Sequence, residues 1–257
     1  MKKLHITLPV ALGALVVWLG LTLGGARLAS GGTPPSMAEA AGGAIGWHWA
    51  LAALFAAAVA LASADRRGAG LGAPAPLNSI RLTWPALVYT LLMLFIAWAG
   101  DLPPRAVVLV VACNAALVAV SEELMFRAVL LQGLLDRYPV WPAVLACSGI
   151  FGLVHAANGF ATGDFDAALW QAAAAGLQGV AYAAIRMRTG SVWPMVAVHG
   201  LWDFSLTTSV LSATAQGETS VLPIAALAAV LPLFLYGLYL LRGMRGQAAP
   251  AVLAHAD

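Results

Sequence analysis

Apolar residues follow one another along the chain in eight stretches, each long enough for a membrane-spanning helix. A helix needs about 20 consecutive apolar residues to cross the hydrocarbon core of a bilayer. Only helices and closed barrels satisfy every backbone group in lipid, and barrel strands alternate apolar with polar positions. These stretches do not alternate. They predict helices over residues 6–24, 45–63, 83–99, 106–134, 142–158, 167–185, 191–212 and 220–241.

Turn-forming residues separate several of the predicted helices. Glycine and proline gather at 31–35, 68–76 and 101–104, and an Asn-Gly pair occupies 158–159. Such clusters are typical of loops. The predicted fold class is therefore all-α: a polytopic membrane bundle of about eight transmembrane helices.

The composition agrees with a chain that is solvated by lipid. Hydrophobic residues make up 61% of the 257 positions and charged residues 9%, whereas a soluble domain carries about 25% charged residues. This excludes an ordinary soluble domain. The sequence has no basic stripe with interleaved aromatic residues, so we expect no nucleic-acid partner.

The basic residues indicate how the bundle is oriented. With the N-terminus inside, ten basic residues fall on inner segments and two, Arg27 and Arg105, on outer segments. Inner loops are richer in lysine and arginine, so the pattern predicts N-in and C-in. The first apolar stretch resembles a signal peptide but is too long for a usual signal core, and we expect it to be a retained helix. The inner basic residues are Lys2, Lys3, Arg66, Arg67, Arg81, Arg137, Arg186, Arg188, Arg242 and Arg245.

The fourth predicted helix carries charges that are costly in lipid. It contains Ser-Glu-Glu-Leu-Met-Phe-Arg at 121–127. Glu123 and Arg127 are four residues apart, share a helical face and can form an ion pair. Glu122 points about 100° away and is left without a partner. An ionisable residue within a membrane indicates a functional site.

Three further polar side chains are predicted at a similar depth. His155 lies on the fifth helix, and His199 and Asp203 lie four residues apart on one face of the seventh. With a rise of about 1.5 Å per residue, Glu122 and Asp203 lie roughly 18 Å above the inner helix ends, His155 roughly 21 Å and His199 roughly 12 Å. Four polar residues on three helices thus fall in one layer near the middle of the bilayer.

At these residues the sequence resembles the CPBP family of intramembrane proteases, which includes type 2 CAAX prenyl endopeptidases and bacterial Abi-type immunity proteins. The family pattern is Glu-Glu-x-x-x-Arg, Phe-x-x-x-His and His-x-x-x-Asn/Asp. Here it reads Glu122-Glu123-x-x-x-Arg127, Phe151-x-x-x-His155 and His199-x-x-x-Asp203, within roughly residues 104–212. The resemblance implies peptide-bond hydrolysis inside the membrane.

The resemblance also implies roles for these side chains. Glu122 and His155 would activate a water molecule, and His199 and Asp203 would bind the oxyanion. The prenyl endopeptidases carry Asn at the last position, so Asp203 fits the wider bacterial group. An ionised Asp203 could not stabilise an oxyanion; it would orient His199, be protonated or bind a metal.

The sequence leaves open whether the site binds a metal cofactor. Glu122, His155, His199 and Asp203 are all acceptable zinc ligands, and a catalytic zinc site needs three ligands and a water. The His-Glu-x-x-His helix of many zinc proteases is absent. The family has been described both as metalloproteases and as metal-free glutamate proteases. A divalent metal such as zinc is therefore one of two possibilities.

The sequence thus predicts three regions: 1–100 with three spans, 101–212 with the catalytic core, and 213–257 with the last span and a cytoplasmic tail. The expected partners are membrane lipid and a peptide or membrane-protein substrate, and the expected location is a bacterial inner (plasma) membrane. The alternative is a non-enzymatic immunity, scaffold or transport protein that uses the same polar layer. Four further polar residues are interpreted as helix contacts, with cavity lining as the second interpretation: His48, Gln171, Gln178 and Tyr182.

Overall fold

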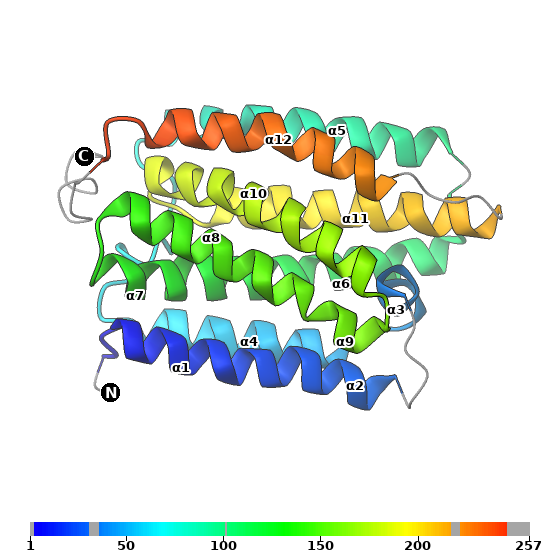
Figure 1. The fold of residues 1–257 in the computed structure, drawn as a ribbon, viewed down its shortest axis with the longest axis horizontal. Coiled ribbons are helices and arrows are strands. Elements are labelled where there is room, and N and C mark those ends of the chain that lie inside the picture. The colour runs from blue at the N-terminus through cyan, green and yellow to red at the C-terminus, as the bar shows by residue number, and fades with distance from the viewer. Residues whose placement is uncertain (1–2, 31–35, 101, 217–221, 246–257) are drawn as a thin grey trace.

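Each apolar stretch of the chain folds into a helix, and the helices pack side by side along one direction (Figure 1). This computed structural model describes residues 3–30, 36–100, 102–216 and 222–245, with only the backbone described at 222–226. Within these ranges the sole β-type pairing is an isolated bridge between Leu4 and Ser63. The predicted all-α class is confirmed.

The helical segments match the predicted stretches closely, and several of them are continuous with the next. In chain order they are α1 (Leu8–Leu19), η1 (Gly20–Gly24), α2 (Gly25–Ala29), α3 (Met37–Gly43), α4 (Trp47–Ala62), η2 (Leu77–Thr83), α5 (Trp84–Ala99), α6 (Arg105–Glu123), η3 (Leu124–Leu130), α7 (Leu131–Leu135), α8 (Val140–Ala156), α9 (Asn158–Thr162), α10 (Phe165–Thr189), α11 (Trp193–Ala215) and α12 (Leu222–Leu241).

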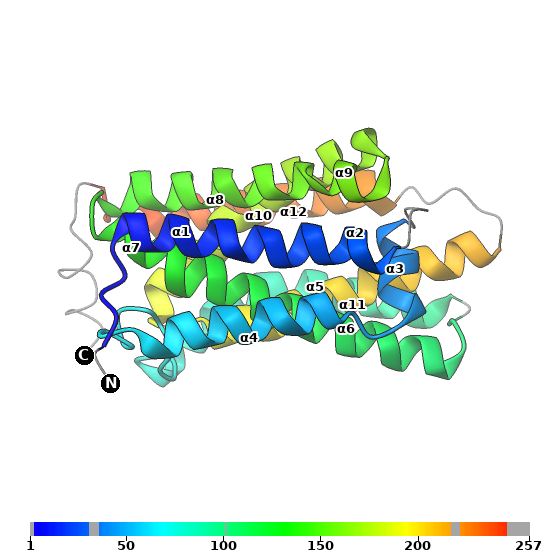
Figure 2. The same cartoon turned by 90° about the horizontal axis from the view of Figure 1, so that it is seen from below.

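The helices that carry the conspicuous polar residues lie in the middle of the bundle. In Figure 1, α1 and α4 form one edge, α5 and α12 form the opposite edge, and α6, α8, α10 and α11 lie between them. Helix α10 packs against α8 and α12, whereas α11 packs against α6 and α5. The view from below shows the same helices running nearly parallel to a common axis (Figure 2).

Length and hydropathy support a membrane protein. Within the described ranges, four helical segments are long and apolar enough to cross a membrane: Leu8–Ala29, Leu77–Ala99, Arg105–Leu135 and Val140–Thr162. The pair α3 and α4, bent by 91°, makes a fifth if it forms one span. The chain is an integral membrane protein with an all-α bundle, while the predicted count of eight spans and the N-in orientation stay predictions.

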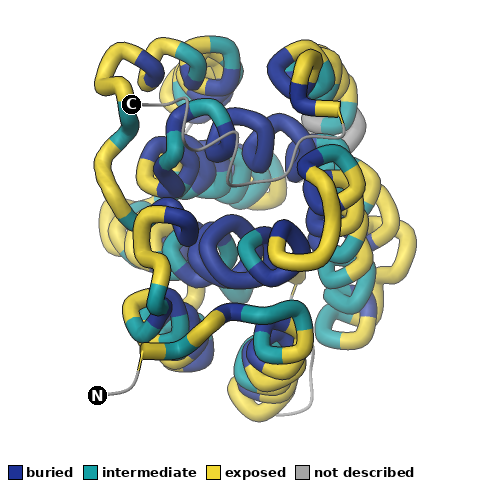
Figure 3. Tube along the Cα trace, turned by 90° about the vertical axis from the view of Figure 1, so that its left-hand side faces the viewer, coloured by how far each residue is buried: buried dark blue, intermediate teal, exposed yellow. Residues whose placement is uncertain are grey.

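Exposure is distributed as expected for a bundle in lipid. Large apolar side chains face outward on most helices, among them Leu54 (67% exposed), Leu153 (72%) and Leu235 (57%). Buried positions line the centre (Figure 3). The longest run of successive buried residues is 178–187 in α10; the next longest, 123–131, covers the end of α6, η3 and the start of α7. This second run anchors the helix that carries the predicted ion pair.

Small residues let the central helices approach closely. A Cβ atom on Gly152 of α8 would lie 2.8 Å from the carbonyl oxygen of Ala172 on α10, and one on Gly237 of α12 would lie 2.7 Å from the Cα of Ala181. Side chains at these positions would push the backbones apart. Glycine at helix contacts is typical of membrane bundles, where packing replaces the hydrophobic effect.

A break between two helices near one end of the bundle depends on one buried amide, that of Asn114. Asn114 of α6 donates hydrogen bonds to the carbonyl oxygens of Ala41 and Ala44, both at 2.8 Å, and accepts one from the Gly46 N–H at 2.9 Å. These bonds satisfy the backbone groups that the bend between α3 and α4 leaves without helical partners. The predicted loop at 31–35 lies outside the described residues.

Two local expectations from the sequence are wrong. The Asn-Gly pair at 158–159 is helical and belongs to α9; the turn comes later, at Gly163, whose φ of 77° suits glycine. The fourth stretch is not a regular α-helix either, because residues 124–130 form the π-helical segment η3. Such π segments often occur at functional sites.

Candidate active site

Four of the polar residues singled out in the sequence come from three helices and converge at one place. Glu122 is near the end of α6, just before the π-helical segment, and His155 is in the last turn of α8. His199 and Asp203 lie one turn apart on α11. An oxygen of Glu122, Oε2, lies 3.8 Å from the Nε2 atoms of both imidazoles. The predicted residues therefore share a depth in the bundle, and the side chains of Glu122 and the two histidines also lie close together.

His155 presents a defined nitrogen to Glu122. Its Nδ1 lies 2.8 Å from the carbonyl oxygen of Phe151, one turn earlier on α8. A carbonyl oxygen can only accept, so Nδ1 carries the hydrogen and Nε2 faces the glutamate. Phe151 also packs edge-on against the imidazole, with ring centroids 4.5 Å apart. The ring orientation of His155 is thus set by its own helix.

His199 lies between three carboxylates. Its Nδ1 is 2.8 Å from Oε1 of Glu123, and its Nε2 is 3.4 Å from Oδ2 of Asp203 and 3.8 Å from Glu122. The short contact to Glu123 places a hydrogen on Nδ1 and directs Nε2 toward the other two carboxylates. A carboxylate that holds the distal nitrogen of a functional histidine sets both its tautomer and its orientation.

Glu123 links His199 to a buried cation. The same Oε1 atom lies 3.1 Å from Nη1 of Arg127, and both side chains are at most 1% exposed. The guanidinium also lies over the ring of Phe151, 4.2 Å from its centroid, and near Tyr182, at 5.6 Å. The predicted Glu123–Arg127 pair is therefore present, and it has a further partner in His199 that helical spacing alone could not show.

Side-chain exposure increases across the cluster in one direction. Glu123 is fully buried, His199 is 6% exposed, His155 13%, Glu122 15% and Asp203 30%. The most exposed group, Asp203, therefore marks the open end. Hollows of about 400 and 500 Å³ lie elsewhere, at the end of the bundle where α1 begins and α12 ends.

A family model matches the segment that carries these four side chains. Residues 104–205 match a family model described as type II CAAX prenyl endopeptidase Rce1-like. This segment is similar to the Rce1-like type II CAAX prenyl endopeptidases. A search of the curated proteins and a search of the solved structures each found no match.

The match confirms the resemblance inferred from the three motifs, since it spans all of them. At the level of the family, it supports an intramembrane endopeptidase of the CAAX type and a peptide substrate. The Rce1-like segment extends from the start of α6 into α11. It therefore contains every residue of the polar cluster, but not α1 to α5 or α12.

Glutamate, histidine and aspartate are all residue types that bind zinc, but in this cluster they are not arranged as zinc ligands. Across the described parts of the chain, no three or more His, Cys, Asp or Glu side chains are placed so that they could hold a metal ion. The four side chains do not fit a metal centre as they stand, and the chemistry below is derived from the side chains themselves.

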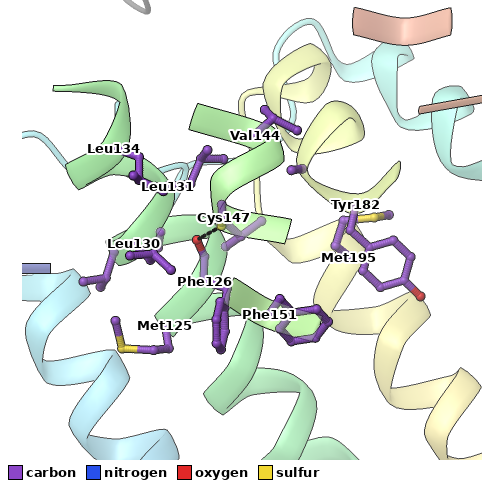
Figure 4. Packing of buried hydrophobic residues seen from close by; sticks show 14 of the residues in the cluster. Met125, Phe126, Leu130, Leu131, Leu134, Val144, Cys147, Phe151, Tyr182 and Met195 are labelled. Atoms are coloured by element: carbon purple, nitrogen blue, oxygen red, sulfur yellow. Dashed lines mark hydrogen bonds between the residues drawn. The ribbon is translucent and has the colours of Figure 1, made fainter. Parts of the chain in front are cut away.

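One side chain at the site was assigned by sequence reasoning to helix packing. Tyr182 of α10 lies edge-on against His199, with ring centroids 5.8 Å apart. Figure 4 shows Tyr182 at one side of the buried core; nearer its middle, Cys147 donates a hydrogen bond to the Phe126 carbonyl oxygen. No motif contains Tyr182. The only signal in the sequence is its depth, which matches that of His199.

Proposed function

We propose that this protein is an intramembrane endopeptidase in which Glu122 and His155 activate the attacking water and His199 stabilises the oxyanion. The observation that carries this proposal is the position of Glu122 Oε2, 3.8 Å from both imidazoles. This oxygen is buried and, among the described residues, it has no hydrogen-bond partner. A buried carboxylate oxygen without a partner is costly unless its function uses it.

The separations suit a water molecule held between Glu122 and His155. A contact of 3.8 Å is too long for a direct hydrogen bond but can be bridged by water. Glu122 would accept a proton from that water, since it is the unpaired carboxylate of the cluster. His155 Nε2 would accept the second hydrogen bond, because its hydrogen is on Nδ1. The oxygen lone pair of the water is then free to attack.

The reaction follows from these positions. The water oxygen adds to the scissile carbonyl carbon as its proton passes to Glu122, and the carbonyl oxygen becomes an oxyanion. His199, cationic between Glu123 and Asp203, faces this charge through Nε2–H. When the oxyanion collapses, the C–N bond breaks and the proton on Glu122 passes to the leaving amine nitrogen. The products are a carboxylate and an amine.

Asp203 is best interpreted as a partner of His199. Its Oδ2 lies 3.4 Å from His199 Nε2, and one helical turn separates the two residues. An ionised carboxylate repels an oxyanion, so direct stabilisation by Asp203 is unfavourable. A contact with the imidazole instead keeps His199 protonated and turned toward the substrate. This departs from the prenyl endopeptidases, where an Asn occupies the position.

The substrate is proposed to be a peptide that reaches the cluster from within or beside the membrane. The family description concerns prenylated CAAX peptides, whereas the Asp203 position argues for a broader choice. A direct test uses the full chain in liposomes with quenched fluorescent peptides ending in Cys-aliphatic-aliphatic-X. Each peptide is supplied with and without a farnesyl group. A peptide library without prenyl groups extends the search.

The decisive variant is Glu122→Gln, which keeps the shape and removes the base. General-base catalysis contributes about 10²- to 10⁴-fold, so we expect cleavage to fall by at least about 10²-fold. Asp166→Asn is the matched control, because Asp166 is an exposed carboxylate in the first turn of α10. Full cleavage by Glu122→Gln would refute the proposal. Full biological activity of this variant without any cleavage would favour a binding or transport role.

A further inference from the structure

Tyr182 combines deep burial with an unsatisfied hydrogen. The residue is 1% exposed, on the half of α10 that is buried on all sides. Its phenolic oxygen accepts a hydrogen bond of 2.8 Å from Nε2 of Gln178, one turn earlier on the same helix. A phenol is a donor as well as an acceptor. Among the described residues, none accepts the hydroxyl hydrogen of Tyr182.

An unused donor at this depth needs an explanation. Leaving a buried donor without an acceptor costs about 1–3 kcal/mol, and such groups are rare in folded proteins. Replacing Tyr182 with Phe would keep the packing against His199 but would leave the buried amide of Gln178 without its acceptor. Gln178 therefore accounts for the hydroxyl as an acceptor, whereas its role as a donor is still without a partner among the described residues.

The hydroxyl lies at the level of the reacting groups. Helices α10 and α11 are joined by a short turn and run antiparallel. Tyr182 is seven residues before the end of α10 and His199 is six residues after the start of α11, so both lie roughly 10 Å from that turn. Helical side chains lean toward the helix N-terminus, which directs the Tyr182 hydroxyl toward the level of Asp203.

The surroundings agree with this direction. The aromatic ring of Tyr182 faces the imidazole of His199 edge-on. In Figure 4 its hydroxyl oxygen is at the end of the ring that points away from the leucine side chains of the core. Gln178 is at the level of Asp203 by the same rise per residue, and its amide donates a hydrogen bond to the phenolic oxygen. The free hydrogen is thus directed away from Gln178.

We propose that Tyr182 is a further catalytic residue, whose hydroxyl, oriented by Gln178, donates a hydrogen bond to the carbonyl oxygen of the scissile peptide beside His199. This inference rests on the proposed endopeptidase function. It also answers a difficulty of this particular site. Where the prenyl endopeptidases carry the amide donor of Asn, Asp203 provides a carboxylate that cannot donate when ionised, and a neutral phenol supplies a donor without adding charge.

The first test compares Tyr182→Phe with Tyr236→Phe in the liposome cleavage assay. Tyr236 is a matched control, because its hydroxyl donates to the Leu82 carbonyl oxygen at 3.0 Å, outside the cluster. Loss of one oxyanion donor lowers kcat by about 10²- to 10³-fold. We expect a fall of that order for Tyr182→Phe, with KM changed by less than about three-fold, and no change for Tyr236→Phe.

A second measurement separates this inference from the proposed function. A phosphinate peptide, which carries the tetrahedral geometry and charge of the intermediate, is titrated into each variant. Tyr182→Phe should weaken its binding by about the same factor as kcat/KM. If the wild-type chain cleaves peptides and the two tyrosine variants behave alike, the inference is wrong and the function stands. If the wild-type chain neither cleaves peptides nor binds the phosphinate, both fail.

A third variant covers the case in which Tyr182→Phe does not fold. Replacing Tyr182 by 3,5-difluorotyrosine keeps the ring and the hydroxyl and makes the hydroxyl more acidic. If the hydroxyl donates in the transition state, the alkaline limb of the kcat profile should move to lower pH, where the difluorophenol loses its hydrogen. A purely structural tyrosine would leave the profile in place, and this result would overturn the inference.

Discussion

Removing the charge of Glu123 should lower stability and activity for two different reasons. Glu123 and Arg127 are an ion pair with almost no solvent access, and Glu123 also holds Nδ1 of His199. In Glu123→Gln, the shape is kept but the guanidinium of Arg127 stays buried without a counter-charge. Loss of one partner of a buried pair costs about 3–5 kcal/mol.

For Glu123→Gln, the contacts of Arg127 indicate a loss of stability at the lower end of this range of about 3–5 kcal/mol. Arg127 retains its position over Phe151 and near Tyr182, at 4.2 and 5.6 Å from the ring centroids. Desolvated cation–π contacts of this kind contribute about 2 kcal/mol. We therefore expect Glu123→Gln to lower the free energy of unfolding by about 3 kcal/mol. The double variant Glu123→Gln/Arg127→Met removes both charges and should recover most of that loss.

Activity should not follow stability. In both variants the amide of residue 123 can donate its N–H to Nδ1 of His199. The imidazole then carries its one hydrogen on Nε2 and is neutral, so it faces the oxyanion without a positive charge. Replacing the orienting carboxylate of a catalytic histidine by an amide can cost about 10⁴-fold in kcat. The double variant is therefore expected to fold nearly as stably as the wild-type chain while staying at least about 10²-fold slower.

Two assays decide between these outcomes. Unfolding free energies are measured by steric trapping in bicelles, and cleavage is measured with the quenched peptides in liposomes. Stability of Glu123→Gln within about 0.5 kcal/mol of wild type would mean that Arg127 is not a buried, paired cation. Recovery of full cleavage by the double variant would mean that Glu123 acts only through Arg127 and does not position His199.

Three other predictions follow from local contacts. Gly152→Ala should lower the unfolding free energy by about 1–3 kcal/mol, because its Cβ would meet the α10 backbone at 2.8 Å. The control is Gly149→Ala, since Gly149 has open space around it. Equal stability of the two variants would contradict close packing of α8 on α10. Asn114→Ala should lower the unfolding free energy by about 2–3 kcal/mol and speed hydrogen exchange at residues 41–46, since three hydrogen bonds to the bend are lost. Unchanged exchange there, with the partly exposed Asn158→Ala as reference, would show that the bend is held by other groups. Prolonged treatment with 1,10-phenanthroline should leave the cleavage rate within about two-fold, since the described side chains form no three-ligand group; a large loss that zinc reverses would assign the polar cluster to a metal centre.

The class of fold could be predicted from the sequence because lipid permits few solutions. An apolar stretch of spanning length has to be helical, and the bounds of α4, α5 and α8 lie within a few residues of the predicted ones. Depth could be predicted for the same reason, since every residue of a helix rises by a constant amount. Glu122, His155 and Asp203 could therefore be assigned to one layer before any contact was known.

Only the tertiary structure decided which helices are neighbours and how each helix is rotated about its axis. In a soluble helix the apolar face reports the rotation, but helices that are apolar all round give no such signal. Their pairing depends on small residues such as Gly152 and on local breaks such as the π-helical segment after Glu123. For this reason the contact of Glu123 with His199 and the position of Tyr182 beside it, which join residues distant in sequence, are visible only once the helices are packed.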